Sequence, residues 1–161
     1  MRPKGWQGKT GQEVREDPRG RDRARVNVGG PGAADLGGRC VLMVAVLRFS
    51  SLRLVLAVLR DVVEHNGYLV LLVKPQFEIG RARLGKGGVV RSANQRAEVV
   101  TEVVAAATTS GLTAMGLCAS PIRGTTGNAE YLVWLTPRPD PGLTTAQVTE
   151  LAATMSTETP T

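Results

Sequence analysis

Two continuous apolar runs, separated by a segment with helical periodicity, most strongly limit the folds open to this sequence. The runs are Val41–Leu47 and Tyr68–Val73, and unbroken runs of this length are typical of strands buried on both faces, as in parallel sheets. Between them, Ser51–His65 has apolar residues at helical spacing and is followed by Asn66-Gly67, which tolerates the positive φ of a helix end. A strand, a helix and a second strand in this order predict an α/β fold.

A second helix is predicted further along the chain. Pro75 is expected to end the strand Tyr68–Val73, because proline has no N–H for a strand ladder. Ser92 with Gln95 three residues later has the pattern of a capping box. The helix that begins there is predicted to end at Gly111, with an inward face formed by Val99, Val103, Val104 and Ala107.

Two further strands, Thr113–Ala119 and Glu130–Thr136, are predicted after that helix. Because no helix separates them, we expect an antiparallel ending to an otherwise parallel sheet. This order is that of the C-terminal half of an open, Rossmann-like sheet. We therefore predict poor order over residues 1–40, an ordered unit over 41–136, and a disordered tail over 137–161 with one helical turn near Ala146–Leu151.

Cysteine and histidine are too scarce for several kinds of site. The 161 residues, the length of one domain, include two cysteines, Cys40 and Cys118, and one histidine, His65. These numbers argue against a disulfide framework, a four-ligand zinc site and a histidine-based triad, so no metal site is predicted. We expect Cys118 to be a buried thiol and His65 to be a cation at a helix C-terminus.

The charge balance favours a polyanionic partner. Lys and Arg outnumber Asp and Glu by 20 to 14, for a net charge of +6. Val41–Val63 is apolar enough to suggest a membrane span, but three arginines interrupt it, each costing about 2.5–3.5 kcal/mol on insertion. No apolar run follows the first charged residues, as a signal peptide would require. We expect a cytoplasmic protein without stable membrane insertion.

Two charged residues lie where an open sheet binds ligands, beyond the carboxyl ends of its strands. Lys74 directly follows the apolar run Tyr68–Val73, and Glu130 opens the last predicted strand. A carboxylate at that position could meet the Lys74 ammonium across the end of the sheet. Taken by themselves, both residues are equally compatible with solvated strand ends. Glu78, the nearest other acid, is interpreted as a loop residue.

The loop over residues 77–91 combines glycines with cations. Glycine lets a backbone approach a phosphate closely, and cations on a mobile loop can close on it. The alternative is a flexible solvated loop. Two glycine-rich segments near the N-terminus, Gly5–Thr10 and Gly29–Gly32, lack the spacing or the preceding strand of a nucleotide-binding motif. The candidate phosphate contacts are Arg81, Arg83, Lys86 and Arg91.

Several motifs carry a family resemblance. These are FSSLRLVL from Phe49, LVKPQFEIG from Leu72, GKGGVVR from Gly85 and ASPIRGTTGNAEYLVWL from Ala119. In this order and spacing they resemble the TlyA-type, haemolysin-like ribosomal RNA 2′-O-methyltransferases. The resemblance is strong over residues 49–136 and weak over residues 14–38. It makes 41–136 part of an FtsJ-like methyltransferase domain and 1–40 a degraded remnant of it.

The resemblance implies a Rossmann-like methyltransferase that uses S-adenosylmethionine to methylate cytidine 2′-hydroxyls in ribosomal RNA. The wider FtsJ-like group has a catalytic Lys-Asp-Lys-Glu set. Lys74, in VKPQFE, falls on the second lysine of that set, and Glu130, in GNAEYL, falls on the glutamate. The implied partner is ribosomal RNA or a ribosomal subunit rather than DNA, and the cofactor-binding residues stay unassigned.

The sequence departs from the family pattern at the strand that normally carries the catalytic aspartate. The family reads like VVADLSFISL there, and this chain reads MVAVLRFSSL, so Val46 occupies the aspartate position and Arg48 the serine position. The first lysine and the glycine-rich turn of the first strand would lie before Met1. We expect this chain by itself to be inactive and to lack a cofactor pocket. The alternative is a non-catalytic RNA-binding member of the family.

Overall fold

The computed structural model describes residues 38–157 of the chain. Both N-terminal glycine-rich segments lie outside the described residues, as does nearly all of the stretch predicted to be poorly ordered. The elements in chain order are β1 (Cys40–Val46), the 3₁₀ turn η2 (Leu52–Leu54), α2 (Leu56–Asp61), β2 (Val63–Val73), α3 (Pro75–Glu78), α4 (Ala93–Thr109), β3 (Thr113–Ala119), β4 (Tyr131–Thr136) and α5 (Thr145–Thr157).

Four strands form one sheet in the order β1-β2-β4-β3. β1 and β2 are parallel, whereas β4 runs antiparallel to both β2 and β3. The predicted α/β class with an antiparallel ending is therefore confirmed. In this order β4, the last strand within residues 38–157, lies between two strands that precede it in the sequence.

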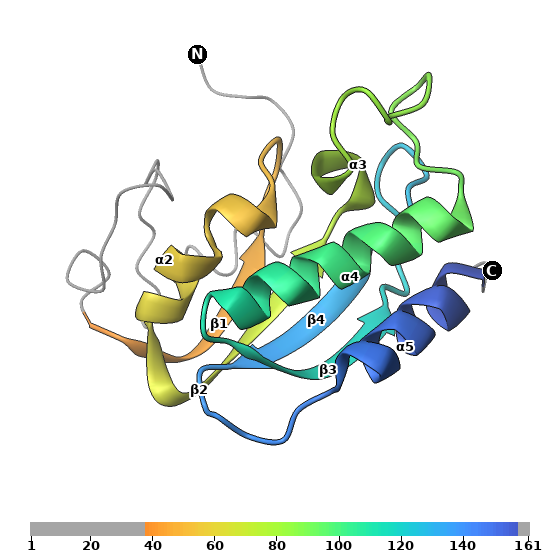
Figure 1. The fold of residues 1–161 in the computed structure, drawn as a ribbon. Coiled ribbons are helices and arrows are strands. Elements are labelled where there is room, and N and C mark those ends of the chain that lie inside the picture. The colour runs from red at the N-terminus through yellow and green to blue at the C-terminus, as the bar shows by residue number, and fades with distance from the viewer. Residues whose placement is uncertain (1–37, 158–161) are drawn as a thin grey trace, which may run out of the picture.

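Helices α4 and α5 lie across one face of the sheet (Figure 1). Side chains alternate between the two faces of a strand, so Leu69, Leu71 and Val73 of β2 are buried, while Tyr68, Val70 and Leu72 are only half-buried. The predicted inward face of α4 is confirmed, because Val99, Val103, Val104 and Ala107 are all buried. Ser92 caps this helix by accepting a hydrogen bond from the Gln95 N–H.

The helix predicted over Ser51–His65 is shorter than its periodicity suggested. It consists of η2 and α2 and ends at Asp61, and β2 begins at Val63. His65 is therefore a strand residue, and the prediction of a helix-end cation is wrong. Gly67 does not end a helix either. It lies in a bulged part of β2, where a Cβ atom would approach the Val41 carbonyl oxygen to 2.7 Å.

Three other expectations differ from the structure. Residues Thr145–Thr157 form helix α5, which packs on α4 and β3, where the sequence predicted a disordered tail with only one helical turn near Ala146–Leu151. Its buried residues Val148 and Ala152 are four apart and so share one helix face. Cys118 is exposed rather than buried. β1 forms as predicted, but Val44 is 63% exposed, because in the described residues β1 pairs on one side only.

Arg96 joins α5 to the rest of the fold. Its guanidinium donates hydrogen bonds to the Tyr131 hydroxyl on β4, to the carbonyl of Arg91 before α4, and to the carbonyl of Ser156 near the end of α5. The Tyr131 and Ser156 hydroxyls also bond to each other at 3.1 Å. Arginine suits this junction because its planar group presents several donors in fixed directions. None of the helices in residues 38–157 is long and apolar enough to cross a membrane.

Candidate functional site

The parallel pairing of β1 and β2 brings two cations to the same edge of the sheet. Val46, the last residue of β1, pairs with Leu72 of β2. Arg48 and Lys74 each lie two residues further along, so both leave the sheet at its carboxyl edge. Pro75 then begins α3 directly after Lys74, which ends the strand at this point, as predicted.

Lys74 and Glu130 form an ion pair at this edge. The Lys74 Nζ lies 3.3 Å from the Glu130 Oε1, and the side chains are only 17% and 7% exposed. The contact follows from the sheet topology, because Tyr131, next to Glu130, pairs with Val73, next to Lys74. The sequence had placed both residues at strand ends, and the structure brings them together. Their catalytic role stays a proposal.

The Glu130 carboxylate is held from two further sides. The Gln76 side-chain N–H donates a 3.4 Å hydrogen bond to the same Oε1 that faces Lys74. Gly124 leaves room for the carboxylate, since a Cβ atom there would stand 2.6 Å from Oε1. The Gln76 Oε1 is buried and has no hydrogen-bond partner among the described residues. It is therefore a free acceptor at the wall of the site.

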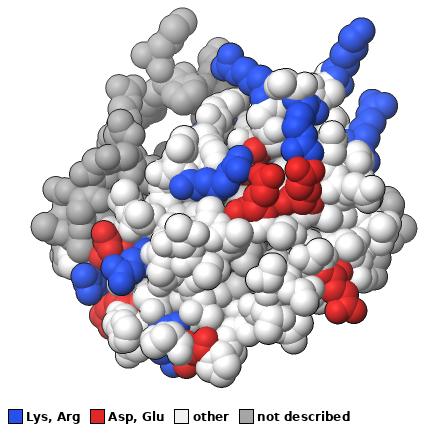
Figure 2. Space-filling model, viewed as in Figure 1, with Lys and Arg blue, Asp and Glu red and all other residues white. Residues whose placement is uncertain are grey.

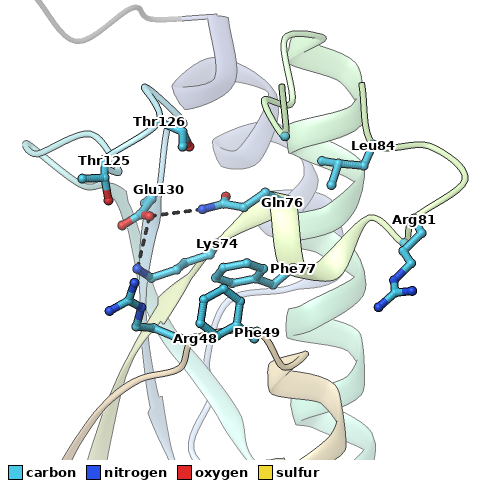
Figure 3. A pocket seen from close by; sticks show the side chains of 12 residues that line it. Arg48, Phe49, Lys74, Gln76, Phe77, Arg81, Leu84, Thr125, Thr126 and Glu130 are labelled. Carbon is cyan, nitrogen blue, oxygen red and sulfur yellow. Dashed lines mark hydrogen bonds and ion pairs between the residues drawn. The ribbon is translucent and has the colours of Figure 1, made fainter. Parts of the chain in front are cut away.

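A cavity of about 500 Å³ opens beside the ion pair (Figure 3). The Phe49 and Phe77 rings meet on one wall, with centroids 5.7 Å apart at 54°. Phe49 has a φ of 64°, a conformation uncommon for a non-glycine residue, and the residue as a whole is 82% exposed. The lining residues are Arg48, Phe49, Lys74, Gln76, Phe77, Gly80, Arg81, Leu84, Gly88, Thr125, Thr126 and Glu130.

The predicted basic loop lies beside this cavity, and its four cations differ in their surroundings. Arg81 lines the cavity but points away from the Lys74–Glu130 pair (Figure 3). Arg83 is hydrogen-bonded to both carboxylate oxygens of Glu98 on α4, which lowers the pKa of Glu98 and raises that of Arg83. Lys86 and Arg91 are exposed. Figure 2 shows lysine and arginine side chains projecting along the edge where Figure 1 places this loop.

Asn128 fastens the basic loop to the loop before β4. Its Oδ1 accepts a 2.9 Å hydrogen bond from the Val90 N–H, and its Nδ2 donates one of 2.8 Å to the Gly88 carbonyl. The side chain is 1% exposed, so these bonds replace water as its partners. Together with the Arg83–Glu98 pair, they hold the loop at both ends. The loop is therefore attached both to α4 and to the loop before β4.

Glu78 is not the loop residue that the sequence suggested. It is the last residue of α3, is 3% exposed, and accepts hydrogen bonds from the Ser51 hydroxyl at 2.5 Å and the Leu52 N–H at 2.6 Å. Arg53 lies 3.5 Å from the same carboxylate. Glu78 therefore fixes the turn after β1, which carries Arg48 and Phe49, against α3.

Sequence reasoning missed several residues of the site. Gln76 lies inside the motif that identified Lys74, two positions further on, and that spacing could have pointed to it. Arg48 was noted only as a departure from a family pattern, although it also lies just beyond a strand. Thr125 and Thr126 gave no signal of their own, because their place depends on how the loop before β4 folds back.

The fold and site together define a class of protein. A partly parallel α/β sheet with an antiparallel ending carries a lysine–carboxylate pair, an aromatic pair and a basic loop at its carboxyl edge. This is the class of Rossmann-like enzymes and their relatives, which bind ligands at that edge.

Comparison with known proteins narrows this class. The model of the FtsJ-like methyltransferase family matches residues 9–136. The 16S/23S rRNA (cytidine-2′-O)-methyltransferase TlyA of Mycobacterium tuberculosis is 40% identical over 136 residues, which are 84% of this chain and 51% of TlyA. Hemolysin A of Brachyspira hyodysenteriae is 29% identical over 91 residues, 56% of this chain and 38% of that protein.

A solved structure agrees with this assignment. The protein described as "Putative hemolysin from Streptococcus thermophilus" superposes with a TM-score of 0.79 at 32% identity, over 89% of this chain and 53% of that one. The chain belongs to the FtsJ-like methyltransferase family, and its similarity to TlyA agrees with the TlyA-type resemblance of its motifs. It spans about half the length of TlyA.

Proposed function

We propose that this chain binds ribosomal RNA at the cavity beside Lys74 and Glu130, and that it does not transfer a methyl group by itself. The observation that carries the proposal is the Lys74–Glu130 ion pair, which faces a cavity walled by aromatic rings and cations. The name of TlyA states that it acts on cytidine 2′-hydroxyls of 16S and 23S RNA. By the resemblance of their motifs, Lys74 and Glu130 fall on two residues of the catalytic set of the family.

The chemistry of the pair suits a ribose hydroxyl. An ammonium next to a hydroxyl favours its ionised form, because the positive charge stabilises the developing oxyanion. Glu130, which accepts a hydrogen bond from Gln76, holds Lys74 in place. The hydroxyls of Thr125 and Thr126, which line the same cavity, can bond to a ribose. The exposed Phe49 ring offers a flat apolar surface to a base, since aromatic side chains stack on unpaired RNA bases.

Val46 is the reason for expecting no methyl transfer. In the family pattern an aspartate at this position would put a carboxylate at the end of β1, on the same edge of the sheet as Lys74. Valine can neither accept a hydrogen bond from Lys74 nor balance its charge. Lys74 therefore has one carboxylate partner, Glu130, among the described residues.

S-adenosylmethionine supplies the methyl group in this family, but the described cavity does not fit it. The cofactor carries a positive sulfonium, and the cavity wall has three cations, Arg48, Lys74 and Arg81, against the one carboxylate of Glu130. Like charges close together in a half-buried site repel. The cavity suits an anionic acceptor such as RNA, and we assign no cofactor residues in it.

Binding can be tested with the full chain and ribosomal RNA transcripts. We expect the logarithm of the association constant to fall linearly with the logarithm of salt concentration, because phosphate contacts release counterions. Lys74→Ala should weaken binding, whereas Arg60→Ala, which removes an exposed cation on α2 away from the cavity, should have little effect. If the wild-type chain does not bind RNA at low salt, the proposal is wrong.

Methyl transfer can be measured on the same RNA with radiolabelled S-adenosylmethionine. We expect no incorporation above background. Incorporation that disappears in Lys74→Ala would show an active enzyme and overturn the second half of the proposal. Incorporation that persists in Lys74→Ala would indicate a contaminating activity.

A further inference from the structure

Arg48 and Lys74 form a pair of like charges at the mouth of the cavity. Figure 3 shows the Arg48 guanidinium beside the Lys74 ammonium, on the side away from Thr126. Lys74 is paired with Glu130. Arg48 has no ion pair with any acidic side chain in residues 38–157. The Lys74 ammonium therefore has the Glu130 carboxylate on one side and the Arg48 guanidinium on the other (Figure 3). Two cations and one carboxylate leave an excess positive charge that a bound anion would neutralise.

The geometry of Arg48 favours a phosphate as that anion. Its guanidinium carbon lies 5.4 Å from the centroid of the Phe49 ring, a cation–π contact that limits the directions in which its donors point. Guanidinium groups bind phosphate through two parallel hydrogen bonds, and less conformational entropy is lost when the group is already oriented. Phe49 is itself held in an uncommon backbone conformation, with φ at 64°.

We propose that Arg48 binds a phosphodiester group of an RNA strand whose ribose lies at Lys74. The inference rests on the proposed function, since it assumes RNA in the cavity. It assigns Arg48 a role that the family pattern does not supply, because that pattern has serine at this position. The same end of β1 therefore loses a carboxylate at Val46 and gains a cation at Arg48. Both changes make the site less suited to methyl transfer and better suited to binding the phosphate backbone of an RNA strand.

The salt dependence of binding tests this assignment. The probe is a short, labelled, single-stranded RNA rich in cytidine, titrated with the full chain by fluorescence anisotropy at several salt concentrations. Each phosphate contact in a single strand contributes about 0.7 to the slope of log K against log salt. We expect Arg48→Ser to reduce the slope by about that amount and Arg48→Lys to preserve it. Arg60→Ser is the matched control, because it removes an equal charge on α2.

A modified RNA locates the contact. Replacing one phosphodiester at a time by a neutral methylphosphonate should weaken binding by the wild-type chain at one linkage. Arg48→Ser should be insensitive to the same replacement. Circular dichroism of each variant confirms that it is folded.

Three outcomes would overturn the assignment while leaving the proposed function intact. The slope could be the same in Arg48→Ser as in the wild type, or Arg60→Ser could reduce it equally. Affinity could also fall in Arg48→Ser at an unchanged slope, which would mean that Arg48 stacks on a base. If the wild-type chain does not bind the probe at all, both the assignment and the proposed function are wrong.

Discussion

Gly124 shows how one absent side chain can determine the position of a charged group. The space that its Cβ would fill is occupied by the Glu130 carboxylate, at 2.6 Å. Its φ does not lie in the left-handed region that favours glycine, so alanine can adopt its backbone conformation. The glycine is needed here for space and not for conformational freedom.

We predict that Gly124→Ala displaces the Glu130 carboxylate and separates it from Lys74. Overpacking of a filled site of this kind costs about 1–3 kcal/mol, measurable as a lower free energy of unfolding in urea. Gly85→Ala is the control, because its Cβ would meet nothing closer than the Val89 carbonyl oxygen at 3.4 Å. If the two variants are equally stable, the contact with Glu130 is not a constraint.

The sequence could identify charged residues at the site but not all of their partners. Lys74 and Glu130 were found because each stands where an apolar run begins or ends. The link from Gln76 to Glu130, by contrast, joins residues 54 positions apart and depends on the pairing of β2 with β4. Glu78 was misread for a related reason, since its burial depends on the turn at Ser51. A local sequence pattern cannot predict a contact between residues that are far apart in the chain.

At the scale of elements, periodicity predicted the strands better than the helix ends. β3 has the bounds expected from its sequence, whereas α2 stops at Asp61 although apolar residues continue at helical spacing. Val62 and Val63 fit the spacing of a helix and also the composition of a strand. The pairing of Val63 with Cys40 places Val63 in a strand. Only one turn of helix α5 was predicted, because its threonines are weak helix formers and its stability comes from packing on α4.

We predict that α5 is a required part of the fold. Val148→Asp would place a charge at a position that is 2% exposed, and should lower the free energy of unfolding by on the order of 3 kcal/mol. Hydrogen exchange should show α5 and the adjoining part of β3 losing protection first. Ala153→Asp, on the exposed side of the same helix, is the control. Equal stability of the two variants would mean that α5 is dispensable.

The tether between the basic loop and α4 should depend on pH. Arg83 lowers the pKa of Glu98 in the folded chain. The ion pair therefore stabilises the folded loop at pH values above the ordinary pKa of a glutamate carboxyl, and this stabilisation is lost as the pH falls through the lowered pKa. We expect hydrogen exchange of residues 81–89, corrected for intrinsic rates, to be slow at neutral pH and to become faster as the pH falls below the ordinary range of a glutamate carboxyl. Glu98→Gln should remove this pH dependence. If the variant keeps it, another group holds the loop.

In the described part of the molecule, helices α4 and α5 cover one face of the sheet (Figure 1), and the sheet also has an exposed apolar surface. Leu42, Val44 and Val46 of β1 and Trp134 of β4 are all more than 40% exposed. Exposed apolar strands at a sheet edge promote association between chains. This surface, rather than the charge of the molecule, should set its solubility.

We predict that Val44→Lys reduces self-association without loss of stability, because Val44 is 63% exposed and contributes little to the core. Dynamic light scattering over a concentration series would show a smaller increase in particle size than for the wild type. Thr149→Lys adds the same charge on the exposed surface of α5 and controls for net charge. If both variants behave alike, charge and not the β1 surface is responsible.

The strand order β1-β2-β4-β3 has a consequence for how the chain is made. Among the strands that the structure describes, β4 is the last to leave the ribosome. It nevertheless takes an interior place, with hydrogen bonds to β2 on one side and β3 on the other. Until residues 131–136 emerge, β2 and β3 have no common partner, and Lys74 has no Glu130 to pair with. Sheet and site are therefore completed together in a single late step, and a nascent chain released earlier would have neither.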